Sequence, residues 1–256
     1  MKKEFFLILC FFYMVMYSVQ AQQKAKPEDT EFYSPVPKLV TPGKAKGDAP
    51  SDAIVLFNGE NLSQWVSAND STKPAKWEVT EGIITVNKKA GDIQTRQSFM
   101  DHQFHIEWRI PEIIAGKGQA RGNSGLFLAS PEDDTGYELQ ILDSYNSSTY
   151  VNGQAGSIYK QYPPLVNANL PPGVWQTYDV IWTAPRFNDD GSIKTPARAT
   201  VLFNGILIQN NVELKGGTPY IGPPSYKKHG PAPIRLQAHG DPSEPISFRN
   251  IWIRPL

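Results

Sequence analysis

The feature that most constrains the fold is a series of short apolar runs, rich in Val, Ile, Phe and Trp, that recur from residue 53 to the C-terminus. Turn-forming residues separate them, and with 22 Pro and 20 Gly among 256 residues the chain turns too often for long helices. We therefore predict an all-β fold, a two-sheet antiparallel β-sandwich of the jelly-roll type. The expected strands are 53–57, 77–79, 83–86, 103–110, 125–130, 137–142, 177–183, 199–203, 206–209, 234–239 and 247–254.

Residues 1–21 have the pattern of an export signal. Lys2 and Lys3 precede an apolar run over 5–19, and small side chains lead up to a cleavage site after Ala21. The run is shorter than the ~20 residues that span a bilayer, so we expect removal of the segment and no stable membrane insertion. The mature protein is then exported, to the periplasm or beyond the cell.

The remaining chain divides into two regions. Residues 22–52 combine charged residues with five prolines and show no amphipathic pattern, so they are predicted to form a flexible tether. Residues 53–256 are predicted to form the folded domain. Cys10 is the single cysteine and lies in the signal, which leaves the mature chain without disulfides, thiolate nucleophiles or Cys-ligated metals.

The charge balance narrows the class of partner. Lys and Arg together number 25, and so do Asp and Glu. Proteins that bind nucleic acid or anionic membranes normally carry a basic surplus, which this chain lacks. A small or uncharged partner fits better, and the oligomeric state stays open.

Three of the predicted strands carry polar side chains at alternate positions, opposite an apolar stripe. Successive residues of a strand point to opposite faces, so each polar stripe shares one face. An ordinary wetted sheet face is one explanation, but Glu, Gln, Arg and His are groups that hydrogen-bond sugar hydroxyls or transfer protons. We predict that six of them converge on one concave face of one sheet: Glu107, Arg109, Glu138, Gln140, Gln237 and His239.

Two other kinds of site are not indicated. The chain has no Gly-x-Ser-x-Gly elbow of the type that presents a hydrolase serine. Its four histidines lack zinc-type spacing, because His102 and His105 lie three apart on a predicted strand and so point to opposite faces. No cofactor is required by the pattern, a divalent metal could assist, and its ligands are not identified.

Several segments in order along residues 54–256 resemble the 3-keto-disaccharide hydrolase domain family. The resemblance implies a concanavalin-A-like jelly roll in an exported bacterial protein that acts on glycosides oxidised to a ketone at C3. Ala238 departs from the family pattern, which has Asp in the Gln-x-His-Gly segment. The matching segments are Leu56–Gly59 with Trp65, Gly91–Thr95, Phe104–Trp108, Gly122–Gly125, Tyr137–Asp143, Gly153–Tyr159, Trp175–Asp179, Asn204–Gly205, Leu236–Gly240 and Phe248–Trp252.

The polar residues suit cleavage of a 3-keto sugar better than two-carboxylate hydrolysis. That mechanism needs two carboxyl groups flanking the scissile bond, and Glu138 is followed on its own face by Gln140. A ketone at C3 acidifies the C2 proton and allows the C1 substituent to be eliminated. One base, one acid and a group that stabilises the enolate then suffice.

We predict Glu138 or His239 for proton transfer, with Glu107 or Asp143 orienting them. The alternatives are a two-carboxylate glycoside hydrolase and a non-catalytic carbohydrate-binding module. The residues expected to bind the carbohydrate are Arg109, Gln140, Gln237, His105, Asn123 and Tyr159.

Overall fold

The computed structural model describes residues 25–132 and 134–256, so the predicted export signal lies outside the described residues. The chain divides into two compact units, one ending at Leu39 and the other spanning Val40–Leu256. The described residues of the first unit contain one short 3-10 helix, η1 (Pro27–Thr30). No described helix has the length and apolar character needed to cross a membrane.

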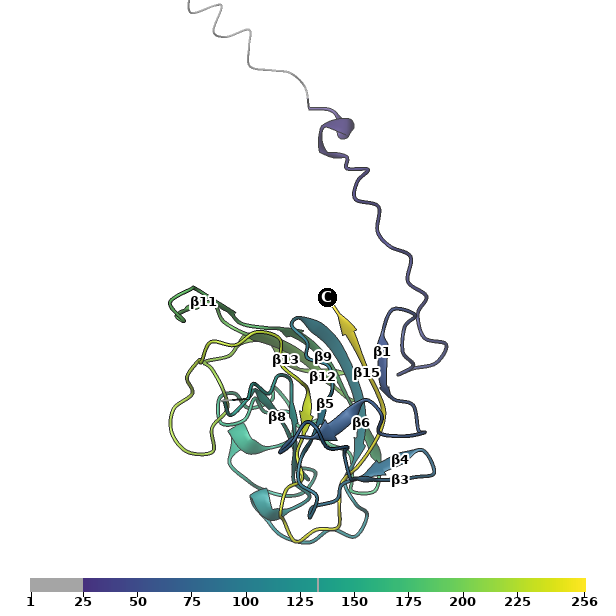
Figure 1. Cartoon of the computed structure of the whole chain (residues 1–256), viewed down its shortest axis with the longest axis vertical. Helices are drawn as coiled ribbons and strands as arrows, with labels where there is room; N and C mark the ends of the chain where they lie inside the picture. Colours follow the sequence, from purple (N-terminus) through teal and green to yellow (C-terminus); the bar gives the residue numbers. More distant parts are fainter. Residues whose placement is uncertain (1–24, 133) are drawn as a thin grey trace, which may run out of the picture. The chain divides into compact units, whose positions relative to one another are not determined.

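The second unit is built from two main antiparallel sheets and one small hairpin (Figure 1). The larger sheet has eight strands in the order β13-β12-β9-β6-β15-β4-β3, with β1 also paired to β15. Its strands are β1 (Ile54–Phe57), β3 (Glu78–Thr80), β4 (Ile83–Thr85), β6 (His102–Arg109), β9 (Trp175–Thr183), β12 (Arg198–Phe203), β13 (Ile206–Glu213) and β15 (Ser247–Pro255).

The smaller sheet has five strands in the order β2-β5-β14-β7-β8. These are β2 (Trp65–Ser67), β5 (Ile93–Thr95), β14 (Arg235–Leu236), β7 (Ser124–Phe127) and β8 (Glu138–Ile141). The hairpin and the short 3-10 turns lie outside both sheets: β10 (Arg186–Phe187), β11 (Ile193–Thr195), η2 (Gly118–Ala120) and η3 (Val151–Gly153).

One hydrophobic core joins the two sheets. The inward stripe of β6, with Phe104 and Trp108, belongs to the same buried cluster as Leu126, Leu139 and Leu236 of the smaller sheet. All five side chains are fully buried. Burial of such stripes on both inner faces is what holds a sandwich together, and the predicted two-sheet all-β fold is confirmed.

The compact unit begins earlier in the chain than the apolar pattern suggests. Residues 40–52 belong to it, although the sequence places them in the tether. The carbonyl oxygen of Gly47 accepts hydrogen bonds from Asn250 Nδ2 at 3.0 Å and from Trp252 Nε1 at 2.8 Å, both on β15. A contact made through a backbone carbonyl leaves no mark in the side-chain pattern.

Candidate functional site

A cavity of about 630 Å³ lies on the five-stranded sheet, on the face that points away from the core. Alternation along the strands selects this face, because Leu126, Leu139 and Leu236 point into the core and their neighbours point outward. Six of the ten site residues predicted from the sequence line this cavity: Asn123, Glu138, Gln140, Tyr159, Gln237 and His239.

The strand register sets the floor of the cavity. Phe127 on β7 lies opposite Glu138 on β8 and, on its other side, opposite Arg235 on β14. Cross-strand partners share a face, so Glu138 and Arg235 flank the Phe127 ring. The Arg235 guanidinium carbon lies 3.7 Å from the centre of that ring. An acid and a cation are thereby held on either side of an apolar ring, near enough for each charge to influence the pKa of the other.

Glu138 is a buried acid whose proton is held tightly. Glu138 is only 6% exposed, and this burial raises the pKa of its carboxyl group to about 8. The charge of Arg235 opposes the rise, whereas Asp92 adds to it. Among the described residues none hydrogen-bonds the carboxyl group, so it is free to exchange its proton with a bound molecule. At neutral pH it is mostly the neutral acid.

Arg235 supplies the positive charge of the cavity. Burial lowers its pKa, while Asp92 and Glu138 raise it. Its Nη2 donates a hydrogen bond to the Thr135 carbonyl at 3.1 Å, and its Nε lies 3.8 Å from Asp92 Oδ2. A guanidinium group keeps its proton in proteins, so the cation is permanent. Arg235, and not Arg109, is therefore the arginine that lines this cavity.

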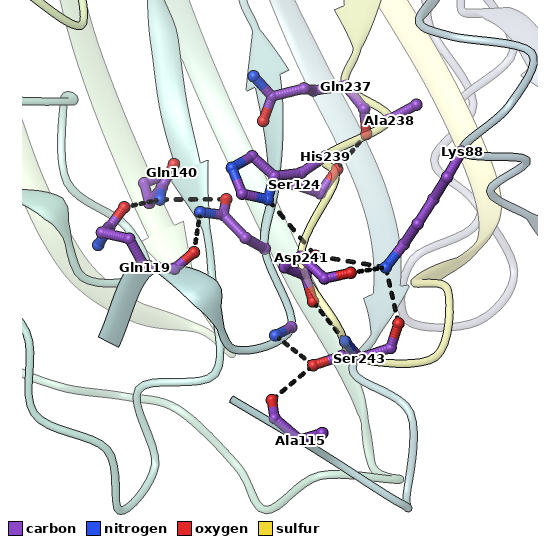
Figure 2. Close-up of polar contacts among 12 residues, drawn as sticks. Lys88, Ala115, Gln119, Ser124, Gln140, Gln237, Ala238, His239, Asp241 and Ser243 are labelled. Atoms are coloured by element: carbon purple, nitrogen blue, oxygen red, sulfur yellow. Dashed lines mark hydrogen bonds and ion pairs between the residues drawn. The ribbon is translucent and has the colours of Figure 1, made fainter. Parts of the chain in front are cut away.

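His239 stands at another part of the cavity wall and is backed by a buried acid (Figure 2). Its Nδ1 lies 3.5 Å from Oδ2 of Asp241, whose side chain is 1% exposed. Burial alone would raise the pKa of Asp241, but the adjacent His239 imidazole, hydrogen bonding from Ser243 and the charge of Lys88 hold it at about 2. The ionised Asp241 therefore lies beside Nδ1, on the side of the imidazole ring away from Nε2.

Lys88 fixes the loop that carries Asp241. Its ammonium group donates hydrogen bonds to the carbonyl oxygens of Asp241 at 2.7 Å and Ser243 at 2.6 Å. The same ammonium group lies 3.5 Å from Asp241 Oδ2 (Figure 2). Lys88, Asp241 and His239 thus form a connected series of polar contacts that ends at the cavity.

An amide network forms a third part of the wall. Gln140 Nε2 donates to Gln119 Oε1 at 3.0 Å and lies 3.4 Å from Asn123 Oδ1. Asn123 Nδ2 in turn donates to the Gln119 carbonyl at 2.7 Å. The Oε1 atom of Gln140 is buried and has no hydrogen-bond partner among the described residues. These amides are held in place and retain capacity to bind hydroxyl groups.

The structure corrects the prediction of one polar face on one sheet. β6 belongs to the eight-stranded sheet, whereas β8 and β14 belong to the five-stranded sheet. Alternation shows which residues of a strand face outward but not which sheet the strand joins. The three polar residues of β6 therefore lie outside the cavity and contact other groups: His105 pairs with Asp179, Glu107 with Arg249, and Arg109 lies over the Trp175 ring.

Asp143 is also outside the cavity. Its side chain is 1% exposed, and its Oδ2 lies 2.6 Å from Arg121 Nε. This buried pair satisfies the carboxylate, so Asp143 does not orient Glu138 or His239. Asp241 takes that role for His239, and the signal that could have found it is its position two residues after the histidine, directly behind Gly240.

Position 238, where the family resemblance implies an acid, is still close to a carboxylate. The backbone N–H of Ala238 donates to Asp92 Oδ1 at 2.8 Å. Asp92 directly precedes β5, the strand next to β14. Although residue 238 is Ala and not Asp, the carboxylate of Asp92 therefore contacts the backbone at this position.

Comparison with known proteins identifies the family. The 3-keto-alpha-glucoside-1,2-lyase-like domain matches residues 52–254. The chain belongs to this family. Comparison with curated proteins gives no match.

Solved structures agree with this placement. A candidate glycosyl hydrolase from Parabacteroides distasonis is 55% identical, covers 92% of this chain and 99% of its own, and superposes with a TM-score of 0.85. A second such protein from the same organism is 21% identical, with a TM-score of 0.57, over 80% of this chain and 94% of its own, and it supports the fold. Family and relative together support a carbohydrate-active enzyme.

Proposed function

We propose that this lyase-like domain cleaves the glycosidic bond of 3-keto-glycosides by removing the C2 proton and eliminating the C1 substituent. The observation that carries the proposal is the pairing, in one cavity, of a neutral acid with an oriented imidazole. Glu138 has a pKa of about 8, and His239 is backed by the ionised Asp241. Glu138 is then in its working, protonated state near neutral pH, and the carboxylate of Asp241 is charged.

The proposed step assigns each proton and electron pair. Nε2 of His239 takes the proton from C2, and the electrons of the C2–H bond delocalise onto the C3 oxygen as an enolate. Collapse of the enolate forms the C1–C2 double bond and breaks the C1–O bond. The leaving oxygen takes the proton of Glu138. Addition of water across C1 and C2 completes hydrolysis, whereas release of the unsaturated ketone completes a lyase reaction.

Arg235 and Gln237 are the groups proposed to bind the enolate oxygen. Both line the cavity, Arg235 from β14 and Gln237 from the residue that directly follows this strand. A fixed cation placed where negative charge develops is among the strongest contributions to catalysis. The amides of Gln140 and Asn123 then hold the remaining hydroxyl groups of the sugar ring.

The lining of the cavity disfavours the two-carboxylate glycosidase mechanism, because its described residues hold no second carboxyl group beside Glu138. Among the described residues that line the cavity, Glu138 is the only one with a carboxylic acid. Retaining enzymes need a second carboxyl group at ~5–5.5 Å and inverting enzymes need one at ~6.5–9.5 Å. Elimination from a 3-keto sugar needs one acid and one base, which is the set that the cavity holds.

The test uses leaving groups of different quality. Glu138→Gln should slow release of methanol from methyl 3-keto-glucoside by on the order of 10²–10⁴-fold, because methoxide needs protonation. It should slow release of nitrophenolate far less. His239→Ala should slow both reactions and abolish exchange of the C2 proton with deuterated water, which Glu138→Gln should retain. Glu107→Gln on the other sheet serves as the matched control and should keep full activity.

Two results would overturn the proposal. Rapid cleavage of unoxidised glucosides with retention of C2 deuterium would favour direct displacement at C1. Binding of sugars without turnover of any oxidised glucoside would favour a carbohydrate-binding module. Export through residues 1–21 is part of the proposal and is tested by N-terminal sequencing of the protein recovered from its native compartment.

A further inference from the structure

Gln119 connects three elements around the cavity and is itself held in one orientation. It lies on η2, and its side-chain Nε2 donates to the Gly153 carbonyl on η3 at 2.7 Å and to Thr149 Oγ1 at 3.0 Å. A backbone carbonyl can only accept, so the nitrogen of this amide must be the atom that faces Gly153. The oxygen of the Gln119 amide therefore faces Gln140 on β8 and accepts from its Nε2 at 3.0 Å (Figure 2).

Asn123 is oriented by a contact of the same kind. Its Nδ2 donates to the backbone carbonyl of Gln119 at 2.7 Å, so its Oδ1 is the end that faces Gln140, at 3.4 Å. Gln140 thus meets two oxygen atoms, and both hydrogens of its Nε2 are directed at them. Rotation of the Gln140 amide by half a turn would place its own oxygen against both of these oxygens, so its orientation is fixed by the network.

The amide of Gln140 can therefore offer a ligand only its oxygen. Gln140 is 1% exposed and lines the cavity, and its Oε1 accepts no hydrogen bond from any described residue. A buried acceptor without a partner is unfavourable, and a ligand that donates to it recovers the lost free energy. A ligand that presents another acceptor at this place leaves the atom unpaired.

We propose that Gln119 and Gln140 select substrates that donate a hydroxyl proton to this wall, with Gln140 in contact with the sugar and Gln119 as the residue that positions it. This inference rests on the proposed function, because it takes the cavity as the place of the reacting ring. Glu138 and Gln140 stand two residues, about 7 Å, apart on one face of β8. With Glu138 at the oxygen on C1, Gln140 meets the far side of the ring, at the hydroxyl of C4 or C6.

The wall then distinguishes substituents by the direction of the hydrogen bond and not by size. Fluorine is close to a hydroxyl group in size but can only accept, so a ring with fluorine at the selected carbon leaves Oε1 of Gln140 unpaired. A ring that is alkylated, acylated or glycosylated at that oxygen has no proton to donate either. The reacting ring is therefore a terminal unit with a free hydroxyl at this position.

The test measures binding of methyl glucoside and of its two analogues with fluorine in place of the hydroxyl at C4 or at C6. NMR titration serves for this, because it needs no turnover. With the wild type, one of the two analogues should bind about 10-fold or more weakly than the parent sugar. Gln119→Leu frees the Gln140 amide to rotate and donate to fluorine, so the difference should shrink to within about 3-fold.

Gln119→Glu is the matched variant. It disturbs the contacts with Gly153 and Thr149 as Gln119→Leu does, but its carboxyl oxygen still accepts from Gln140 Nε2, so the preference for the parent sugar should persist. Gln103→Leu, a change of an outward glutamine on β6 of the other sheet, should bind all three sugars as the wild type does. Loss of the preference in both Gln119 variants would show that Gln119 acts only by anchoring η3, and would overturn its positioning role.

Equal binding of the three sugars by the wild type, or an unchanged difference in Gln119→Leu, would overturn the selection. Turnover of methyl 3-keto-glucoside tests the proposed function separately. A preference without turnover would refute the elimination and keep this inference, whereas turnover without a preference would do the reverse. If the methyl glucosides bind too weakly to titrate, KM for the corresponding 3-keto-glucosides gives the same comparison. A protein that neither binds nor turns over these sugars would overturn both.

Discussion

The carboxyl group of Glu138 occupies the space that a side chain at Gly125 would fill. A Cβ built on Gly125 would lie 2.5 Å from Glu138 Oε1, closer than any ordinary contact. Gly125 has no left-handed backbone, so alanine suits its conformation, and the flexible carboxyl group would be the part that moves. Gly125→Ala should therefore keep the fold and lower the rate for methyl 3-keto-glucoside by on the order of 10²-fold, because the acid is misplaced.

Activity and thermal unfolding measured on the same sample check this. Gly230→Ala, where no atom lies within 4 Å of the added carbon, is the control and should keep its rate. An unchanged rate in Gly125→Ala would mean that the position of the Glu138 carboxyl group does not matter.

The pH dependence of activity should reveal the protonation state of Glu138. If the group acts as an acid, kcat/KM for methyl 3-keto-glucoside falls as pH rises through about 8, where Glu138 loses its proton. For nitrophenyl 3-keto-glucoside, which needs less protonation of its leaving group, the fall should be shallower. A rate that instead rises through this pH would make Glu138 the base and exchange its role with His239.

Stability should depend on the same group with a defined sign. The pKa of Glu138 is about 8 in the folded protein against an ordinary value of 4.5. The folded state therefore holds a proton that the unfolded state releases between these pH values, so the free energy of unfolding falls as pH rises from 4.5 to 8. The loss is on the order of a few kcal/mol, at about 1.4 kcal/mol per pKa unit.

Denaturant unfolding of the wild type and of Glu138→Gln at several pH values measures this. The variant cannot ionise, so its stability should fall less over the same interval, and the two curves should separate most above pH 8. Parallel curves would show that the carboxyl group is better solvated than its burial indicates.

Lys88 should be needed for the correct placement of His239, although it does not line the reaction cavity. Lys88→Met removes the two hydrogen bonds to the loop that bears Asp241. We expect slower C2 proton exchange, by about 10-fold or more, with little change in KM, because the imidazole is less well oriented. Lys89→Met changes the exposed neighbour and should have no effect. Partial rescue by Lys88→Arg would separate orientation from simple loss of packing.

The N-terminal boundary of the stable domain should fall near residue 40. Removal of residues 1–52 deletes the Gly47 carbonyl that binds Trp252 and the Asp52 carboxylate that lies 2.8 Å from Arg254 Nε. Removal of residues 1–39 keeps both contacts. We expect the shorter protein to melt several degrees below the longer one. Equal melting temperatures would instead show that residues 40–52 add no stability, in agreement with the predicted tether over residues 22–52.

The strands and the sheet face that carries the cavity could be predicted to different extents from the sequence. Alternation in β6 correctly placed Phe104 and Trp108 in the core, because one-sided burial leaves a period of two. The same alternation placed Glu138 and His239 outward but could not assign β6 and β8 to different sheets, since strand pairing is set by contacts distant in sequence. The contacts of Lys88 could not be predicted either, because its partners are backbone carbonyl groups of a loop that is distant in sequence.

The pairing of Arg235 with a neutral Glu138 has a consequence for inhibitors. A cationic sugar mimic would meet a protonated acid and a fixed cation in this cavity, so it would gain no ion pair there. A planar ring with an anionic oxygen at the position of C3 would instead resemble the charge that develops during the proposed elimination. Compounds of this enolate type, rather than protonated amines, are the scaffolds from which selective ligands of this site can be developed.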